Sequence, residues 1–272
     1  KGRILSEEIG QTLADDLSSV QISLKADVVD DSVSWVITDA QGAQVAKAEG
    51  KEAQIILDSP VLWWPHDQGE PHLYTATAKT STEEKSVRFG VRRVRLVMHE
   101  GAWNYPASMP KSRSHPPMTL EVNGRRIFGK GSNWVPPDIF PGRVERSQVQ
   151  ALLEMAKASH MNLLRLWGGG PVQKGFFYDL CDELGIMVWQ EFPLACSSYP
   201  DDADYLELLD KESRAIIRRV KSHACLALWS GGNELFNSWS GMTDQSLALR
   251  KLNANCLELD PHTPFIPTSP LD

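Results

Sequence analysis

The chain has 272 residues, of which 42% are hydrophobic, and its formal net charge is −7. This length suits one large or two medium-sized domains, and the acidic balance argues against a surface that binds nucleic acid. No apolar run approaches the roughly 20 residues that a membrane-spanning helix needs, so no membrane partner is expected.

The cysteines and the two ends of the sequence set further limits. The four cysteines are scattered without a Cys-x-x-Cys pair, so neither a zinc site nor a disulfide framework is indicated, and no metal or cofactor is expected. The sequence opens on Lys1 rather than Met and shows no signal-peptide pattern. We therefore expect a piece of a longer protein, whose compartment and oligomeric state the sequence does not indicate.

Residues 1–97 show the alternation of apolar and polar residues that is typical of strands. The predicted strands are Val20–Val28, Val33–Ile37, Ala53–Leu57, Leu73–Ala78 and Val87–Val91. Short strands at this spacing, separated by turn residues, predict a small antiparallel β-sandwich. Between them, Trp63-Trp64-Pro65 has two interpretations, a sugar-stacking platform or a packing anchor, and we favour the packing anchor.

The pattern changes after residue 97, where a second domain is predicted over residues 98–272. Residues 99–117 carry four prolines and are predicted to form a loop. Asn123-Gly124 then lies between two apolar runs, which is a strong signal for a β-hairpin. We expect the second run, Ile127-Phe128, to be the first strand of the region that follows.

Strands and helices alternate in this region. The predicted strands are Leu163–Trp167, Ile186–Glu191 and Cys225–Trp229, followed by an apolar run at Pro264–Pro267. The predicted helices begin at a Ser147–Gln150 capping box, at about Pro171 with a stop at Gly185, at a cap formed by Asp204, and at about Asp244. A repeated β-loop-α unit predicts parallel strands, either in an open doubly wound sheet or in part of a (β/α)8 barrel.

Two features of this region could indicate a functional site, but we interpret both as structural. Gly168-Gly169-Gly170 follows a strand, and Glu191 lies at the distance of a ribose-binding acid, but Pro171 and the missing third glycine argue against a dinucleotide site. His223 precedes the Cys225–Trp229 strand, at the end opposite to Glu234, and is predicted to be a structural residue. No nucleophile elbow, phosphate loop or His-Glu-x-x-His motif is present.

Polar and aromatic residues recur at the carboxyl ends of four successive predicted strands. They are Asn133 and Trp134, Arg165 and Trp167, Trp189 and Glu191, and Trp229, Asn233 and Glu234. In a barrel these ends converge on one mouth. Aromatic faces, a guanidinium, an amide and carboxyls together suit a sugar ring, and a carboxyl can protonate the glycosidic oxygen. A single Glu is usually a surface residue, and it is the repetition that makes Glu234 a candidate catalyst.

These stretches resemble glycoside hydrolase family 2. The resemblance is carried in order along most of the chain by Phe89–Arg92, Val122–Gly124, Gly131–Asp138, Arg165–Gly170, Trp189–Phe192 and Trp229–Glu234, and it is strongest to the β-mannosidase branch. The segment from Leu62 to Tyr74 also resembles the immunoglobulin-like domain of that branch.

The resemblance implies a fold and a set of roles. It implies an immunoglobulin-like β-sandwich over residues 1–97 and the first half of a (β/α)8 TIM barrel over residues 98–272. It implies a retaining exo-β-glycosidase that removes terminal β-D-mannose, with Glu234 as general acid/base and Asn233 bound to the 2-hydroxyl. Trp167 matches a tryptophan that lines the substrate site, whereas Glu191 stands where the branch often has Asp, which leaves its role open.

The substrate expected from this resemblance is an oligosaccharide or glycoside, bound by Asn233, Trp167, Arg165, Trp134 and Glu191. The nucleophile of the family is a Glu at the end of the seventh barrel strand, beyond the fifth strand at which this sequence stops, so we expect this chain alone to be inactive. Two alternatives stay open. One is a sister activity, as a β-galactosidase, β-glucuronidase or exo-β-glucosaminidase, and the other is a carbohydrate-binding piece without catalysis.

Overall fold

A computed structural model of the protein describes residues 2–102 and 118–271. Contacts divide the chain into two units, one that runs up to Arg93 and includes Ser222–Ala224, and one that comprises Val94–Lys221 and the residues from Cys225 onward. The predicted boundary between residues 97 and 98 falls inside strand β8 (Val94–Met98), which pairs with a strand of the second unit. Most of the predicted loop 99–117 lies outside the described residues.

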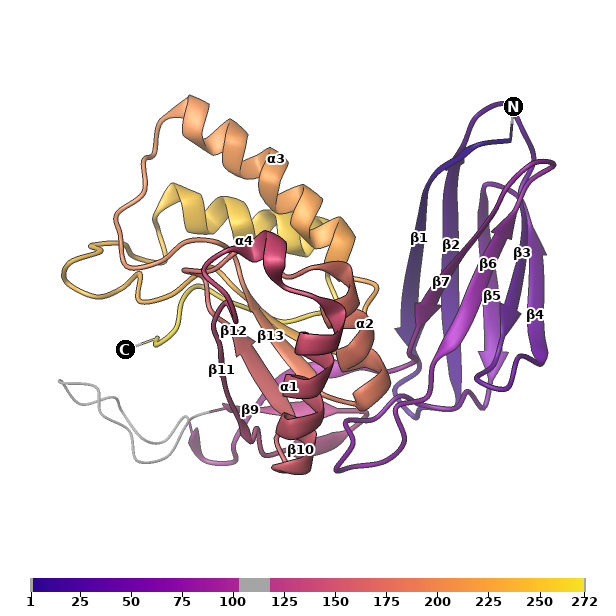
Figure 1. Ribbon diagram of the computed structural model, residues 1–272, viewed down its shortest axis with the longest axis horizontal. Coiled ribbons are helices and arrows are strands. Elements are labelled where there is room, and N and C mark those ends of the chain that lie inside the picture. Colours follow the sequence, from indigo (N-terminus) through magenta and orange to yellow (C-terminus); the bar gives the residue numbers. More distant parts are fainter. Residues whose placement is uncertain (1, 103–117, 272) are drawn as a thin grey trace. The chain divides into compact units, whose positions relative to one another are not determined.

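The first unit contains two antiparallel sheets that share one hydrophobic core. One sheet has the order β1 (Ile4–Leu13), β2 (Ser19–Val28), β5 (Glu52–Asp58), and the other has the order β4 (Gln44–Glu49), β3 (Ser34–Thr38), β6 (Tyr74–Lys79), β7 (Glu84–Phe89) (Figure 1). Every second residue of β2 is buried, as the alternation of its sequence requires. Ile22 and Leu24 from one sheet and Trp35 and Ile37 from the other belong to the same core.

The structure extends the strands expected in this unit. Each of the five predicted strands overlaps or adjoins an observed one, but β1 and β4 had not been predicted. Strand β4 lies at the edge of its sheet, and none of its residues is fully buried, so its sequence lacks an apolar face to signal it. The indole of Trp63 is completely buried, which is consistent with packing rather than with a sugar platform.

The second unit opens with a three-stranded antiparallel sheet in the order β10 (Arg125–Ile127), β9 (Met118–Val122), β8. Asn123 and Gly124 adopt φ values of 50° and 77°, the left-handed conformation that a tight hairpin turn needs, so the predicted hairpin is confirmed. The expectation for Ile127-Phe128 is wrong, because Ile127 pairs back onto Leu120 and Phe128 is 81% exposed. The first parallel strand begins later, at Gly131.

The centre of the second unit is a five-stranded parallel sheet in sequence order. Its strands are β11 (Gly131–Trp134), β12 (Leu163–Leu166), β13 (Met187–Glu191), β14 (Leu226–Ser230) and β15 (Phe265–Ile266). Helices α1 (Arg146–Ala158), α2 (Gly175–Leu184), α3 (Ala203–Val220) and α4 (Leu247–Leu259) follow the first four strands, and a short 3-10 helix, η2 (Pro141–Arg143), precedes α1 (Figure 1). The predicted alternation of strands and helices is confirmed.

The two faces of the parallel sheet carry different residues. Trp134, Leu166, Gln190 and Trp229 are aligned by the register and are all buried. Helices cover this face, because Phe177 of α2 packs on Trp134 and Tyr178 of the same helix donates a hydrogen bond to Gln190 at 2.6 Å. The opposite face carries the side chains one position earlier in each strand.

Helices α3 and α4 lie side by side (Figure 1) and are joined by polar contacts. Arg214 of α3 donates two hydrogen bonds to Glu258 of α4, at 2.9 and 2.7 Å. Asn255 of α4 bonds Ser213 and Asp210 of α3. In the described ranges, 2–102 and 118–271, no helix is both long and apolar enough to cross a membrane.

Candidate active site

The carboxyl ends of the parallel strands bring together several of the predicted site residues. The register places Asn133 of β11 beside Arg165 of β12, and Arg165 beside Trp189 of β13. Side chains alternate along a strand, so Glu191, two residues after Trp189, lies on the same face. Asn233 and Glu234 follow β14 after two glycines. Asn133, Arg165, Trp189 and Glu191 therefore project from the face of the sheet opposite to the helices.

Arg165 is the centre of a hydrogen-bond network at this edge. Its Nε donates to Glu191 Oε1 at 2.9 Å, and its Nη2 forms an ion pair with the same oxygen at 2.8 Å. Nη1 donates to Asn133 Oδ1 at 2.9 Å, and Nη2 donates to Asn233 Oδ1 at 2.6 Å. One guanidinium thus connects residues from β11, β13 and the segment after β14.

Glu191 is buried at the centre of this network, with 1% of its surface exposed. Its Oε1 bonds Arg165, and its Oε2 accepts the backbone N–H of Gly168 at 2.7 Å. Burial raises the pKa of the Glu191 carboxyl, while Arg165 and the Gly168 N–H act in the opposite direction. With both oxygens occupied by protein donors, Glu191 links β13 to the turn that follows β12.

That turn, residues 167–170, depends on its glycines. A Cβ on Gly168 would lie 2.6 Å from the carbonyl oxygen of Leu194 and 2.7 Å from that of Phe192, closer than real contacts allow. A Cβ on Gly169 would overlap the indole of Trp167, so the ring folds back over that glycine. The half-buried Trp167 is thereby held at the carboxyl end of β12.

The segment after β14 is fixed by its backbone. A Cβ on Gly231 would lie 2.2 Å from the carbonyl oxygen of Pro267, so only glycine fits there. The N–H of Asn233 donates to Leu194 O at 2.9 Å, and that of Glu234 donates to Ser269 O at 2.8 Å. Glu234 itself has φ +55°, a left-handed conformation that costs a non-glycine residue about 1–2 kcal/mol.

Glu234 is half-buried, and the structure surrounds it with polar contacts. The thiol of Cys196 lies 3.4 Å from Glu234 Oε2, and Asn233 Nδ2 donates to the same sulfur at 3.0 Å. The hydroxyl of Ser240 donates to the carbonyl oxygen of Glu234 at 2.7 Å. The strained backbone is thus held from both sides, which is common at functional sites.

Trp134 is a predicted site residue that the structure does not bring to this cluster. It is 9% exposed, and its ring lies 4.9 Å from that of Phe177, between the sheet and α2. The alternation of the strand turns Trp134 away from Asn133, the residue before it. Trp229 also lies on the helix side, where its Nε1 donates to Asp260 at 2.8 Å. The position of a tryptophan at the end of a strand does not indicate which face of the parallel sheet its ring covers.

Cys196 is a member of the cluster that the sequence reasoning missed. It lies in the loop after β13, which had been recognised only by its prolines. The available signal was its position, five residues after the end of β13 at Glu191, since loops at the carboxyl ends of parallel strands often carry site residues. A single thiol after the apolar residues Phe192–Ala195 formed no motif that could distinguish it.

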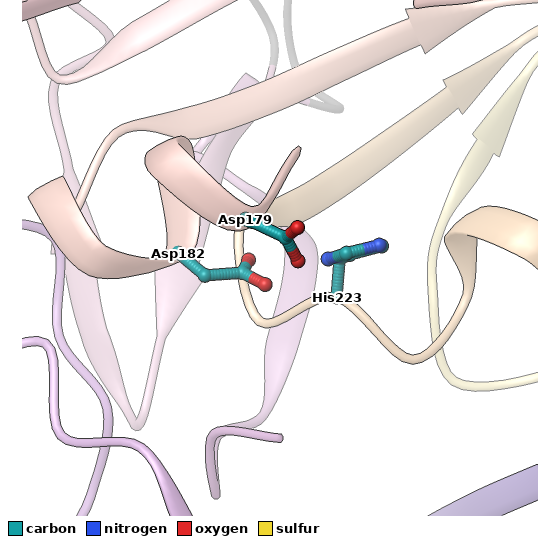
Figure 2. Close-up of side chains that lie close together, drawn as sticks. All are labelled: Asp179, Asp182 and His223. Carbon is teal, nitrogen blue, oxygen red and sulfur yellow. The ribbon is translucent and has the colours of Figure 1, made fainter. Parts of the chain in front are cut away.

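Two buried or half-buried acids lie elsewhere in the unit. Figure 2 shows Asp179 and Asp182 on α2, three residues apart. Asp182 accepts the backbone N–H of Cys225 at 2.8 Å, directly before β14 begins. His223, also drawn, is grouped by its contacts with the first unit. Asp182 thus holds the backbone at the start of β14 through a hydrogen bond. We infer no metal site from Asp179 and Asp182.

The cluster offers the groups that a hydroxyl-rich ligand needs. The Asn233 amide and the Arg165 guanidinium are donors at the carboxyl ends of the strands, Trp167 presents a partly exposed aromatic ring, and Glu234 presents a carboxyl that can exchange a proton. Such a set suits a sugar better than an apolar ligand.

Comparison with known proteins identifies the family that the chain resembles. The family model described as Glycosyl hydrolases family 2 matches residues 8–92. A β-mannosidase from Capra hircus is 37% identical over 236 residues, which cover 79% of this chain and 26% of the relative. A β-mannosidase A from Emericella nidulans is 37% identical over 217 residues, covering 77% of this chain and 22% of the relative.

Solved structures show the same likeness. A β-D-mannosidase from Dictyoglomus thermophilum superposes with a TM-score of 0.84 at 29% identity, covering 99% of this chain and 35% of that one. β-glucuronidase 3 from Bacteroides uniformis gives a TM-score of 0.77 at 21% identity, with 97% and 33% covered, and shares the fold alone. The chain spans about a quarter of the length of the curated relatives it matches.

Proposed function

Because the chain belongs to glycosyl hydrolases family 2 and is similar to β-mannosidases along most of its length, we propose an activity for the full-length protein. It hydrolyses terminal β-D-mannose residues at the non-reducing ends of its substrates. The reaction proceeds with retention of the anomeric configuration. The substrate is an oligosaccharide or other glycoside. This chain carries the acid/base half of the catalytic pair.

The proposed architecture explains the position of Glu234. The two antiparallel sheets of the first unit are an immunoglobulin-like sandwich, and the five-stranded parallel sheet is the first half of a (β/α)8 barrel. The sequential strand order and the helix after each of the first four strands support this assignment. In such a barrel the carboxyl ends of all strands surround the substrate.

Glu234 is the general acid/base of the proposed reaction. It gives its proton to the glycosidic oxygen as the bond to the leaving group breaks, and it then removes a proton from the water that releases the sugar. The observation that carries this role is the position of Glu234 after β14, on a left-handed backbone fixed by Ser269 and Ser240. The nucleophile is a Glu outside this chain, at roughly 5–5.5 Å from Glu234.

The neighbouring residues bind and orient the sugar. Asn233 binds the 2-hydroxyl, and Trp167 lies against the ring. Arg165 and Glu191 act mainly through others, because their polar atoms are engaged with Asn133, Asn233 and Gly168. Trp134 has no part in this proposal, since its indole packs on Phe177.

A panel of aryl glycosides tests the substrate. The full-length protein should hydrolyse an aryl β-D-mannoside faster than the matching β-galactoside, β-glucuronide and β-glucosaminide, and nuclear magnetic resonance should detect the β-anomer of mannose first. Faster hydrolysis of another glycoside would identify a sister activity. Binding of these glycosides without hydrolysis of any would identify a carbohydrate-binding protein instead.

A further inference from the structure

We propose that Cys196 is a positioning residue for Glu234. Its thiol holds Oε2 of the Glu234 carboxyl and leaves Oε1 as the oxygen that exchanges the proton with the substrate. The catalytic part of this inference rests on the proposed acid/base role of Glu234. The hydrogen bond itself does not, and it can be tested separately.

The direction of the hydrogen bonds follows from Arg165. A guanidinium has five N–H donors and no acceptor. The side-chain atom of Asn233 that lies 2.6 Å from Arg165 Nη2 must therefore be its oxygen. The Asn233 NH2 group is then turned toward Cys196, where Nδ2 lies 3.0 Å from the sulfur.

The Cys196 thiol is the last donor in this series of hydrogen bonds. Because its sulfur accepts a hydrogen from Asn233, its own single hydrogen is free to point at Glu234 Oε2, 3.4 Å away. Hydrogen bonds thus run from Arg165 through Asn233 and Cys196 to Glu234, and every donor points toward the carboxyl. The guanidinium that binds Glu191 is therefore also connected to Glu234, through Asn233 and Cys196.

The backbone makes this contact a fixed feature of the loop. The N–H of Cys196 donates to the carbonyl oxygen of Asn233 at 2.9 Å, and Ala195 forms a parallel bridge with Asn233. Cys196 has φ +51°, so the residue is held in a left-handed conformation beside the equally left-handed Glu234. Thiol and carboxyl are therefore carried by two backbone segments that are bonded to each other.

The charges around the thiol make the contact measurable. Glu234 and Glu191 are the carboxylates that act on it, and Arg165 lies beyond Asn233. Partial desolvation, followed by the hydrogen bond to Glu234, raises the pKa of the Cys196 thiol. Thiolate is the form that reacts with alkylating reagents, so loss of the contact with Glu234 should speed the reaction of Cys196.

The first test uses this chain alone and needs no glycosidase activity. Cys196 is exposed, whereas Cys181, Cys225 and Cys256 are buried, so iodoacetamide should label Cys196 first, as read by peptide mass spectrometry. In Glu234→Gln the carboxyl that raises the pKa of the Cys196 thiol is gone, so the alkylation rate at neutral pH should rise about threefold. Glu212→Gln, at an exposed position of α3, is the matched control and should react like the wild type.

Equal alkylation rates in the wild type, Glu234→Gln and Glu212→Gln would overturn the hydrogen bond. A rate increase in both variants would overturn it too, because it would reflect net charge rather than contact.

The second test uses the full-length protein. Cys196→Ser keeps a donor and should retain most activity, whereas Cys196→Ala should lose roughly tenfold in kcat/KM on a poor leaving group, a fraction of the effect of losing a general acid. The Ala variant should also shift the pH profile, which a merely structural defect would not do. Equal kinetics and equal pH profiles in the two variants would overturn the positioning role. A full-length wild type without glycosidase activity would refute the proposed function and the positioning role that depends on it, while leaving the result for the thiol contact intact.

Discussion

At the scale of single residues, the sequence predicted where Glu191 lies but not what it does. The sequence placed it at a strand end and left open whether it touches substrate or supports the mouth. The structure fills both of its oxygens with protein donors, Arg165 and the Gly168 N–H. A carboxylate engaged in this way is a support for the Trp167 turn and for Arg165, and we propose that role for it.

Replacing Glu191 with Gln should lower the free energy of unfolding of the second unit. A Gln has one acceptor oxygen and one NH2 group, so either the Gly168 N–H or the Arg165 guanidinium faces another donor. Arg165 also loses its ion-pair partner in a site where its side chain is 14% exposed. Breaking a buried pair from one side costs about 3 kcal/mol.

Circular dichroism at 222 nm during urea unfolding measures this loss, because the described helices all lie in the second unit. Glu212→Gln removes one exposed carboxylate from the same unit and should change the free energy of unfolding by less than about 0.5 kcal/mol. If the two variants are equally stable, Glu191 does not support the turn.

At the scale of elements, α3 shows where a helix start can be misread. The sequence placed the cap at Asp204, but the helix begins at Ala203 and its N-cap is Asp202, whose Oδ1 accepts the Tyr205 N–H at 2.9 Å. Asp202 and Asp204, two residues apart, have the same capping propensity, and only the backbone geometry distinguishes them. The capping box expected at Ser147 fails for a similar reason, since α1 starts at Arg146 without a side-chain cap.

Asp202→Ala should therefore destabilise the second unit by about 1 kcal/mol, the usual contribution of an N-cap hydrogen bond. Asp202→Asn keeps an acceptor oxygen and is the matched control, with an expected loss of a few tenths of a kcal/mol at most. Urea unfolding followed at 222 nm measures both. An alanine variant as stable as the asparagine variant would show that this cap contributes nothing.

The sequence could predict those elements that carry a period or a special turn. The Asn123-Gly124 hairpin, the stop of α2 at Gly185 with φ +72°, and the buried stripe of Leu209, Ile216 and Val220 on α3 all follow from local chemistry. Ser213 interrupts that stripe, yet it is buried because Asn255 of the next helix bonds it. That partner lies 42 residues away, which no local pattern can reveal.

The first parallel strand was misassigned for a comparable reason. Ile127-Phe128 is more apolar than Gly131–Trp134, so hydrophobicity favoured the wrong segment. Gly131 is needed because a Cβ there would overlap the carbonyl group of Leu163. Asn133 of β11 is polar because it accepts a hydrogen bond from Arg165. Strands that carry site residues lose the apolar signal by which strands are recognised.

At the scale of the molecule, we propose that the chain carries part of the active site. Of its relatives' length it spans about a quarter, and among the described strands β11 and β15 form the two edges of the parallel sheet. Open edges of this kind are usually paired or covered in a folded protein. The proposed barrel would pair them and would bring a second carboxyl to face Glu234.

The measurement that tests this account most directly is the dependence of Glu234→Ala on the leaving group. In the full-length protein, the variant should lose about 10²–10⁴-fold in kcat/KM on an aryl β-D-mannoside with a poor leaving group, which needs a proton. It should lose far less on one with a good leaving group, which departs without protonation. Hydrolysis of the poor substrate at the wild-type rate would contradict the assignment of Glu234 as the general acid/base.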